Sequence, residues 1–195
     1  MANFWTQGQT EPKRNFRFKV QFTGISTTIQ APTDIIWWAK TVTTPSFEVS
    51  EVEHNYLDNK FYYPGRVSWN EVSLTLVDPI SVDAVNLTNQ LLVASGYVVK
   101  GNETVSQTMS KAQAIQAGLS NIIIEVLSAK GDVVETWTLN NPFIKSAKYG
   151  DLDYSSDDLR TVEMSIRYDW AECINQDGDT LFAPSTGAPV IGPST

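Results

Sequence analysis

The chain has 195 residues, of which 42% are hydrophobic and 18% charged, and its formal net charge is −8 at pH 7. This length and composition are typical of one globular domain and exclude wholesale disorder. The negative charge argues against a protein that grips nucleic acid through a basic face, although an acidic protein can still let DNA pass without holding it.

Cys173 is the only cysteine, so no internal disulfide can form, and we expect a reducing compartment. The first 15 residues contain no apolar run of the length that a signal peptide needs. No window approaches the roughly 20 apolar residues of a membrane span, so no membrane anchor is expected. The sequence therefore predicts a soluble protein made in the cytoplasm.

The N-terminal segment, residues 1–14, is mostly polar and is expected to form an arm rather than part of the core. Apolar and polar side chains then alternate over residues 16–22, which predicts a first strand that ends at Gly24. Residues 35–42 are more continuously apolar and predict a second strand.

Two further strands are predicted on either side of a long aromatic-rich segment. In the first, Phe47 and Val49 alternate with Glu48 and Ser50. In the second, the apolar residues are Val72, Leu74 and Leu76, and the polar ones between them are Glu71, Ser73 and Thr75. Each strand is thus expected to be half-buried, with one apolar and one polar face.

The intervening residues 54–69 are predicted as a loop that is far too long for a tight hairpin turn and is closed by Pro64-Gly65. Its large apolar side chains are Tyr56, Leu57, Phe61, Tyr62 and Tyr63. Soluble monomers seldom expose so much aromatic surface on one loop, so this segment is expected to pack on something. Two interpretations stay open: it covers the protein's own core, or it contacts another copy.

After Pro79 the apolar residues follow a helical period. Ser81 or Asp83 can cap this helix, and Gly96 can end it. Its apolar face consists of Val85, Leu87, Leu91, Leu92 and Ala94. A second helical segment is predicted over residues 109–117.

Beta structure resumes at residue 121. Residues 121–129 and 133–139 predict a hairpin around Lys130-Gly131-Asp132, followed by a short strand over 143–149. Clear alternation over residues 162–170 predicts the last strand. In all, about seven strands and one main helix predict a mainly β fold, a β-sandwich or partly open barrel with a flanking helix.

The final residues, 175–195, are rich in Pro, Gly, Ser and Thr and are expected to be a flexible tail. The segment before the last strand is acidic and contains Asp151, Asp153, Asp157 and Asp158. It lacks the residue spacing of a calcium-binding loop, so solvated carboxylates are expected there. The sole histidine, His54, has no partner spacing for a metal site or a catalytic triad. We therefore expect no catalytic site, no cofactor and no metal.

Several short motifs stand in a specific order between Asn15 and Glu172. They are Asn15-Phe16-Arg17-Phe18, Ala39-Lys40, Thr44-Pro45-Ser46, Pro64-Gly65 before Trp69, Leu74 to Pro79, Asn141-Pro142, Gly150-Asp151-Leu152-Asp153, and the strand from Val162 to Trp170. In this order and spacing the chain resembles the tail tube proteins of contractile-tailed bacteriophages. The same fold occurs in the inner tubes of type VI secretion and other contractile injection systems. The resemblance fits the main tube subunit and also a tube protein nearer the baseplate.

The resemblance implies a domain over residues 15–174 with two packed antiparallel sheets, a flanking helix and a long hairpin. Six copies would form a ring, and stacked rings would form a hollow tube in the virion tail that carries genomic DNA. Strands of neighbouring subunits would join into one barrel around the lumen. The implied partners are other copies of the chain, the tail sheath protein, and the baseplate and tail-terminator proteins.

Two sets of residues are candidates for these roles. Residues 54–69, with the five large side chains named above, are expected to connect stacked rings. The lumen is expected to be an acidic, polar wall lined by Glu48, Ser50, Glu71, Ser73, Thr75, Glu163 and Ser165, which would repel DNA weakly from every side. Arg167 shares this polar face, and Glu163, Asp169 or a neighbouring subunit is expected to neutralise it.

Two other functions compete with a tube subunit. A β-sandwich that binds carbohydrate would use the loop aromatics as a stacking platform, and a hydrolase of unrecognised type would use His54 or the loop carboxylates. A binding module should stay a small monomer, whereas a tube subunit should form rings or polymers.

Overall fold

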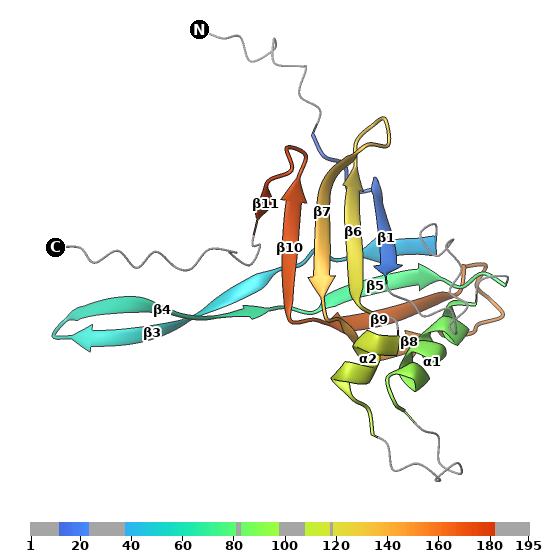
Figure 1. Cartoon of the computed structure of the whole chain (residues 1–195), viewed down its shortest axis with the longest axis horizontal. Coiled ribbons are helices and arrows are strands. Elements are labelled where there is room, and N and C mark those ends of the chain that lie inside the picture. Colours follow the sequence, from blue (N-terminus) through green and yellow to red (C-terminus); the bar gives the residue numbers. More distant parts are fainter. Residues whose placement is uncertain (1–11, 24–37, 81–82, 98–107, 118, 182–195) are drawn as a thin grey trace, which may run out of the picture.

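The computed structural model describes residues 12–23, 38–80, 83–97, 108–117 and 119–181 (Figure 1). Most of the expected N-terminal arm, part of the second predicted strand and most of the C-terminal tail lie outside these residues. The elements in chain order are β1 (Phe18–Thr23), β2 (Ala39–Val42), β3 (Phe47–Tyr56), β4 (Asn59–Trp69), β5 (Val72–Val77), α1 (Ala84–Ala94), α2 (Lys111–Ala117), β6 (Asn121–Leu127), β7 (Val133–Asn140), β8 (Phe143–Tyr149), β9 (Thr161–Arg167), β10 (Trp170–Asn175) and β11 (Thr180–Leu181).

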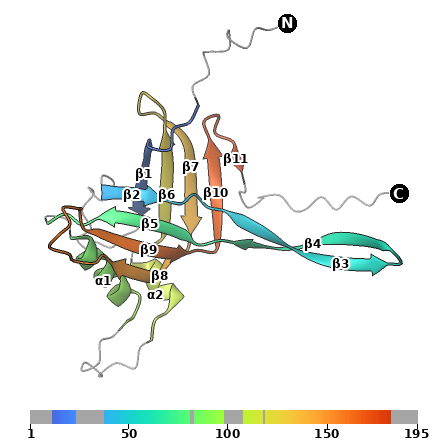
Figure 2. The same ribbon diagram turned by 180° about the vertical axis from the view of Figure 1, so that it is seen from behind.

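Two antiparallel sheets form the body of the protein. One has the strand order β1-β6-β7-β10-β11, and the other has the order β2-β5-β9-β8. The strands of the two sheets cross at a steep angle in Figure 1, as in orthogonal sheet packing. The third sheet is the two-stranded β3–β4 hairpin, which extends away from the body in both Figures 1 and 2. The expected mainly β fold with two packed sheets, a flanking helix and a long hairpin is confirmed.

The core lies between the two sheets. On β5 and β9 the alternation predicted from the sequence holds, because Leu74 and Met164 are almost completely buried while Ser73 and Glu163 are exposed. Burying an aliphatic side chain of this size contributes about 1.5–3 kcal/mol of transfer free energy. The other fully buried large residues include Val20, Leu76, Ile122, Ile124, Leu139 and Ile166.

Helix α1 packs on the four-stranded sheet through Leu87 and Leu91, which belong to the same apolar cluster. Of the two candidate caps, Asp83 is the N-cap residue, because its carboxylate accepts a hydrogen bond from the backbone N of Asn86 at 2.9 Å. The helix ends before Gly96, whose φ of +100° suits a residue without a side chain. Neither described helix is long and apolar enough to cross a membrane.

The predicted last strand, residues 162–170, is wrong at its end. Strand β9 stops at Arg167, the chain bends at Tyr168 and Asp169, and β10 continues in the other sheet. The backbone N of Asp169 donates to the carbonyl of Asn140 at 3.1 Å, which holds this corner. The alternation of apolar and polar residues continues through this bend, so it did not indicate where the strand ends. Trp170 fits the apolar positions of the predicted strand, although its side chain is exposed.

The chain also forms more strands than the sequence predicted. Strand β10 runs to Asn175, and residues 176–179 turn back so that β11 pairs with β10. The first part of the expected tail is therefore a short hairpin at the edge of the five-stranded sheet. The predicted hairpin over residues 121–139 is confirmed as β6 and β7, with Gly131 at φ +90° in its turn.

Candidate functional site

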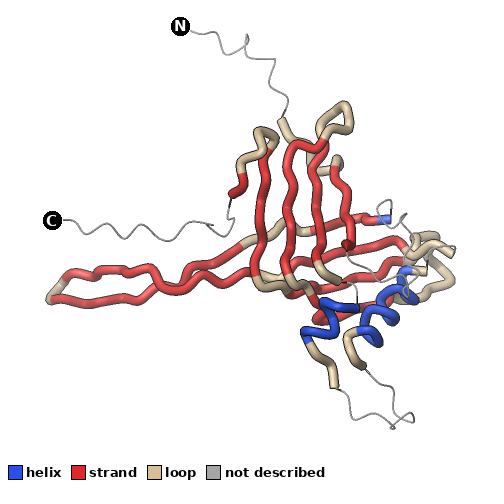
Figure 3. Tube along the Cα trace, in the orientation of Figure 1, coloured by secondary structure: helices blue, strands red, loops and turns tan. Residues whose placement is uncertain are grey.

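Residues 54–69 are not a long loop, and this prediction is corrected. Strands β3 and β4 pair continuously from Phe47 opposite Trp69 to Tyr56 opposite Asn59. The turn between them is tight and consists of Leu57 and Asp58, with Leu57 in the left-handed region at φ 52°. We call residues 47–69 the β3–β4 ribbon; Figure 3 shows it as two strands that leave the body side by side.

The sequence Pro64-Gly65 lies inside β4, where it forms a bulge instead of a turn. The pairing register shifts between Val49 and Glu51, so Gly65 and Arg66 together oppose Ser50. The Ser50 hydroxyl accepts a hydrogen bond from the backbone N of Arg66 at 2.8 Å. Proline is tolerated in a strand at such a bulge, because the ladder is already interrupted there.

The bulge moves the apolar side chains from one face of the ribbon to the other. Near the body, the cross-strand pairs Phe47–Trp69 and Val49–Val67 share a face. Beyond the bulge, the opposite face carries the pairs Val52–Tyr63 and His54–Phe61, since successive side chains of a strand alternate sides. The ribbon therefore has two apolar patches, one on each face.

Every residue from Phe47 to Ser68 is exposed. The exposed fraction reaches 86% at Leu57, at the tip, and is 57% at both Tyr62 and Tyr63. The interpretation that this segment covers the protein's own core is therefore wrong. The five large residues proposed for contacts between rings all lie in the outer half of the ribbon, where they have room to contact a partner.

The outer face of the four-stranded sheet collects five of the seven candidate lumen residues. Ser73 lies opposite Ser165, and Thr75 lies opposite Glu163. Glu71 reaches the same face from the start of β5, and its carboxylate accepts a hydrogen bond from the Ser165 hydroxyl at 2.7 Å. Glu48 and Ser50 do not join them, because they belong to the β3–β4 ribbon.

This face is polar and carries both carboxylates and cations. Glu71 forms an ion pair with Lys145 and lies 3.8 Å from the guanidinium of Arg167. Glu163 lies opposite Lys148 in the register of β8 and β9. Hydrogen bonds from Lys145 and Ser165 hold the pKa of Glu71 below its usual range.

Within the subunit, the acidic partner of Arg167 is Glu71 rather than Glu163 or Asp169, and the third expected partner, a neighbouring subunit, stays a prediction. Asp169 instead forms an ion pair with Lys111 of α2 and accepts a hydrogen bond from the side-chain amide of Asn141 at 3.0 Å. This pair fastens α2 to the corner between β9 and β10. The Lys111 contact, and to a smaller extent Asn141, lowers the pKa of Asp169 despite its partial burial.

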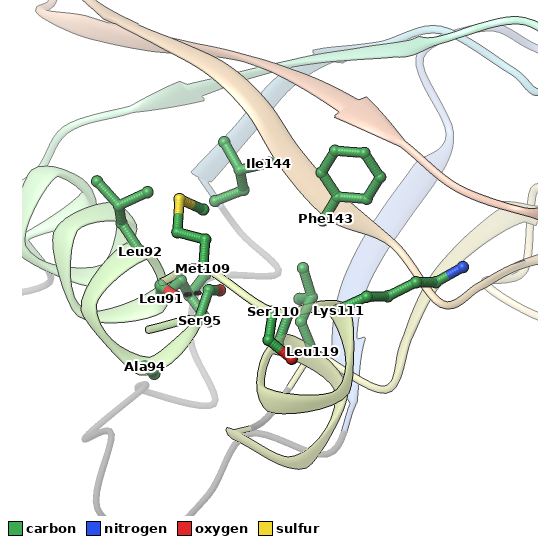
Figure 4. A pocket seen from close by; sticks show the side chains of 11 residues that line it. Leu91, Leu92, Ala94, Ser95, Met109, Ser110, Lys111, Leu119, Phe143 and Ile144 are labelled. Atoms are coloured by element: carbon green, nitrogen blue, oxygen red, sulfur yellow. Dashed lines mark hydrogen bonds between the residues drawn. The ribbon is translucent and has the colours of Figure 1, made fainter. Parts of the chain in front are cut away.

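A cavity of about 230 Å³ lies between the two helices and β8, and the sequence did not predict it. Figure 4 shows the side chains of Leu92, Met109, Phe143 and Ile144 around it. Its lining comes from separate segments of the chain, so no local pattern marks it. The described residues contain no group of three or more His, Cys, Asp or Glu side chains that could hold a metal ion.

No known family profile and no curated protein matches this sequence. The fold, however, is that of tube and cap proteins of contractile injection systems. It matches the tube-terminating cap of the anti-feeding prophage with a TM-score of 0.60 at 15% identity, over 90% of this chain and 99% of the other. It also matches a chain of the sheath–tube complex of an extracellular contractile injection system with a TM-score of 0.57 at 15% identity, over 90% and 99% of the two chains. A third match, in the anti-feeding prophage baseplate, has a TM-score of 0.57 at 15% identity over 85% and 97%.

Proposed function

We propose that this chain is a structural subunit of the tube of a contractile tail or injection system, in which rings of copies stack into a hollow conduit. The observation that carries the proposal is the β3–β4 ribbon, which projects from the body with no buried residue before Trp69. A two-stranded ribbon alone is only marginally stable in water. Its apolar patches make sense if another subunit covers them in the assembly.

The shared fold supports the same proposal, since the matched chains belong to tubes, caps and baseplates of contractile machines. The ring of six follows from the resemblance to phage tail tube proteins. A head-to-tail interface whose rotation closes would generate such a ring and remove the exposed edges at β2 and β8. The sheath, baseplate and terminator proteins are the proposed outside partners, and the virion tail the proposed location.

We propose further that the outer face of the four-stranded sheet lines the conduit, with DNA as the cargo in a phage. Small hydroxyl side chains such as Ser73, Thr75 and Ser165 dominate this face, and its carboxylates are near cations. A wall with strong excess positive charge would bind several phosphates per ring and hold the DNA. A wall with balanced charge lets the duplex slide. Replacing Glu71 and Glu163 by lysine should leave tubes intact but slow genome delivery, and unchanged delivery would refute this role.

The experiment for the tube proposal removes the outer ribbon. Residues 51–64, which begin and end at the paired positions Glu51 and Pro64, are replaced by a two-residue Asn-Gly turn. Because none of these residues joins the core, the variant should keep its circular dichroism spectrum and its melting temperature. Negative-stain electron microscopy should show tubes for the natural chain and none for the variant.

A matched control changes another exposed turn. Replacing Lys130 and Asp132, which lie in the β6–β7 turn, by serine removes one positive and one negative charge from a surface away from the ribbon and should leave tubes intact. Tubes of normal length from the shortened chain would overturn the assignment of the ribbon to stacking.

A cap or baseplate-proximal ring is the second candidate, because two of the matched chains come from a tube-terminating cap and from a baseplate. Such a protein should form single rings that do not lengthen with concentration, whereas a main tube subunit should form filaments. Carbohydrate binding is less favoured, since the ribbon aromatics are divided between two faces and do not form one platform. A stable monomer that binds sugar polymers would reverse this ranking.

A further inference from the structure

A groove of about 730 Å³ opens between the start of β1 and the outer strand β2. Its charged lining residues are four cations and one carboxylate: Lys13, Arg14, Arg17, Lys40 and Glu135. Lys13 is ion-paired with Glu135, whereas Arg14 and Lys40 are exposed and form no ion pair with another described residue. We call this the basic groove. In a chain with a net charge of −8, it is a local concentration of positive charge.

The β8–β9 loop, residues 150–160, is the electrostatic counterpart, and we call it the acidic loop. It carries four carboxylates: Asp151, Asp153, Asp157 and Asp158. Its only cation, Arg160, lies 3.5 Å from the carboxylate of Asp78. All residues from 151 to 160 are exposed, including Leu152 at 81% and Tyr154, whose side chain touches almost nothing.

The base of the acidic loop is held closed, so the carboxylates are presented on an ordered segment. The backbone N of Gly150 donates to the carbonyl of Thr161 at 2.9 Å. Within the loop, the Asp153 carboxylate accepts hydrogen bonds from the backbone N and the hydroxyl of Ser155, which lower its pKa. Asp151 and Asp157 have no side-chain hydrogen bond or ion pair with another described residue. These two charges are available to a partner.

The topology places the groove and the loop at opposite edges of the four-stranded sheet. The groove borders β2 and the loop follows β8, and these are the two outer strands in the order β2-β5-β9-β8. Three strand spacings of about 4.8 Å separate the two edges. A second copy can place its β8 beside β2 and continue the antiparallel alternation of the sheet. If Tyr149, the last residue of that β8, lies beside Val42, the antiparallel register carries Asp151 of its acidic loop next to Lys40.

We propose that the acidic loop of one copy binds in the basic groove of its neighbour within the ring, an inference that rests on the proposed ring assembly. The contact is head-to-tail: each copy offers its groove to one neighbour and its loop to the other. Charge complementarity fixes the register of the neighbouring copies. Partly exposed apolar lining residues of the groove, such as Val42 and Val126, provide a surface for Leu152 or Tyr154 of the loop. Since the charges are exposed, ring formation should weaken as salt is raised.

Two charge-reversed chains test this contact. The groove variant carries Arg14→Glu and Lys40→Glu, and the loop variant carries Asp151→Lys and Asp157→Lys. All four side chains are exposed, so circular dichroism should confirm that both variants fold. The control reverses two charges of the β6–β7 turn, Lys130→Glu and Asp132→Lys. The measurement is the lowest concentration at which each protein forms rings or tubes, followed by light scattering and electron microscopy.

Each variant alone should need at least about a tenfold higher concentration than the natural chain, because like charges face each other at every interface. The groove variant becomes more acidic overall and the loop variant less acidic, so a general effect of net charge would move them in opposite directions. An equimolar mixture should assemble nearly as well as the natural chain, since alternating copies restore opposite charges at every contact and six positions permit alternation.

The control should behave like the natural chain. If either variant assembles normally by itself, or if the mixture fails to recover, the contact between loop and groove is wrong while the tube proposal stands. If the natural chain remains a monomer at every concentration, the ring proposal fails, and this inference fails with it.

Discussion

The hydroxyl of Ser50 occupies the space into which a side chain at position 65 would project. A Cβ atom added to Gly65 would lie 2.3 Å from the Ser50 Oγ and 2.9 Å from the Ser50 carbonyl oxygen. The first contact could be relieved by rotation of the serine, but the second involves the backbone of the opposite strand. The bulge in the β3–β4 ribbon thus depends on a residue without a side chain at this position.

Gly65→Val should disrupt the ribbon beyond the bulge without unfolding the body. We expect a nearly unchanged melting temperature, because residues 51–64 make no part of the core, together with loss of tube formation. Hydrogen exchange of residues 51–64 measures the ribbon directly. Ser50→Ala is the control: it removes the two hydrogen bonds between the Ser50 hydroxyl and the backbone of Arg66 but adds no side chain at position 65, so assembly should survive. Normal tubes from Gly65→Val would refute the requirement.

Leu74→Ala should lower the free energy of unfolding by about 2–5 kcal/mol, the range observed for large-to-small changes in a packed core. Leu74 is completely buried between the sheets. The matched control is Leu57→Ala at the ribbon tip, where the exposed fraction is 86% and the expected change lies within about 0.5 kcal/mol. Urea denaturation gives both values. Equal losses for the two variants would show that the tip is buried in solution.

Asp83→Ala should cost about 1 kcal/mol, because it removes the carboxylate that caps α1 through the backbone N of Asn86. Asp83→Asn is the matched control and should retain most of the stability, since an amide oxygen can accept the same bond. Thermal melting distinguishes the two. A loss from the asparagine variant as large as that from alanine would show that the negative charge, rather than the hydrogen bond, matters.

The ion pair between Asp169 and Lys111 should make stability fall in acid. The pKa of Asp169 is lower in the folded than in the unfolded chain, so its stabilising effect is present above the unfolded value of about 3.9 and is lost as pH falls through the folded value. Asp169→Asn should therefore lower the melting temperature at neutral pH but have little effect near pH 2.

The control for this pH series is Asp132→Asn in the β6–β7 turn, which should track the natural chain at every pH. A melting temperature difference between the natural chain and Asp169→Asn that stays constant from pH 7 to pH 2 would contradict the role of the ion pair.

The sequence predicted the core faces of β5 and β9 correctly, because a sheet that buries one face imposes a period of two on its residues. The same rule could not locate the end of β9. The chain bends after β9 and enters the other sheet, yet Tyr168 and Trp170 still fit the alternating apolar pattern of β9. Only the pairing of β10 with β7 shows where the bend lies. Partners that are distant in sequence, such as β7 and β10, leave no local pattern.

The ribbon was misjudged for a different physical reason. Pro64-Gly65 is a strong turn signal, whereas the actual turn at Leu57-Asp58 contains neither proline nor glycine. Leucine is uncommon at a positive φ, so its place at the tip was not predictable from propensity. The aromatic residues expected to pack on a partner are exposed on this ribbon, and their role in contacts between rings stays a proposal. The mixed charge around Glu71 became visible only when β8 and β9 were placed beside β5.

Cys173 gives this chain a built-in chemical reporter. Its thiol is buried in β10 beside β11, and burial raises the pKa of the thiol above its usual value, so it should react slowly with alkylating reagents in the folded subunit. No second cysteine competes for the label. The rate of labelling therefore measures how often the edge of the five-stranded sheet opens. It can be compared between the free subunit and the assembled one without any substitution.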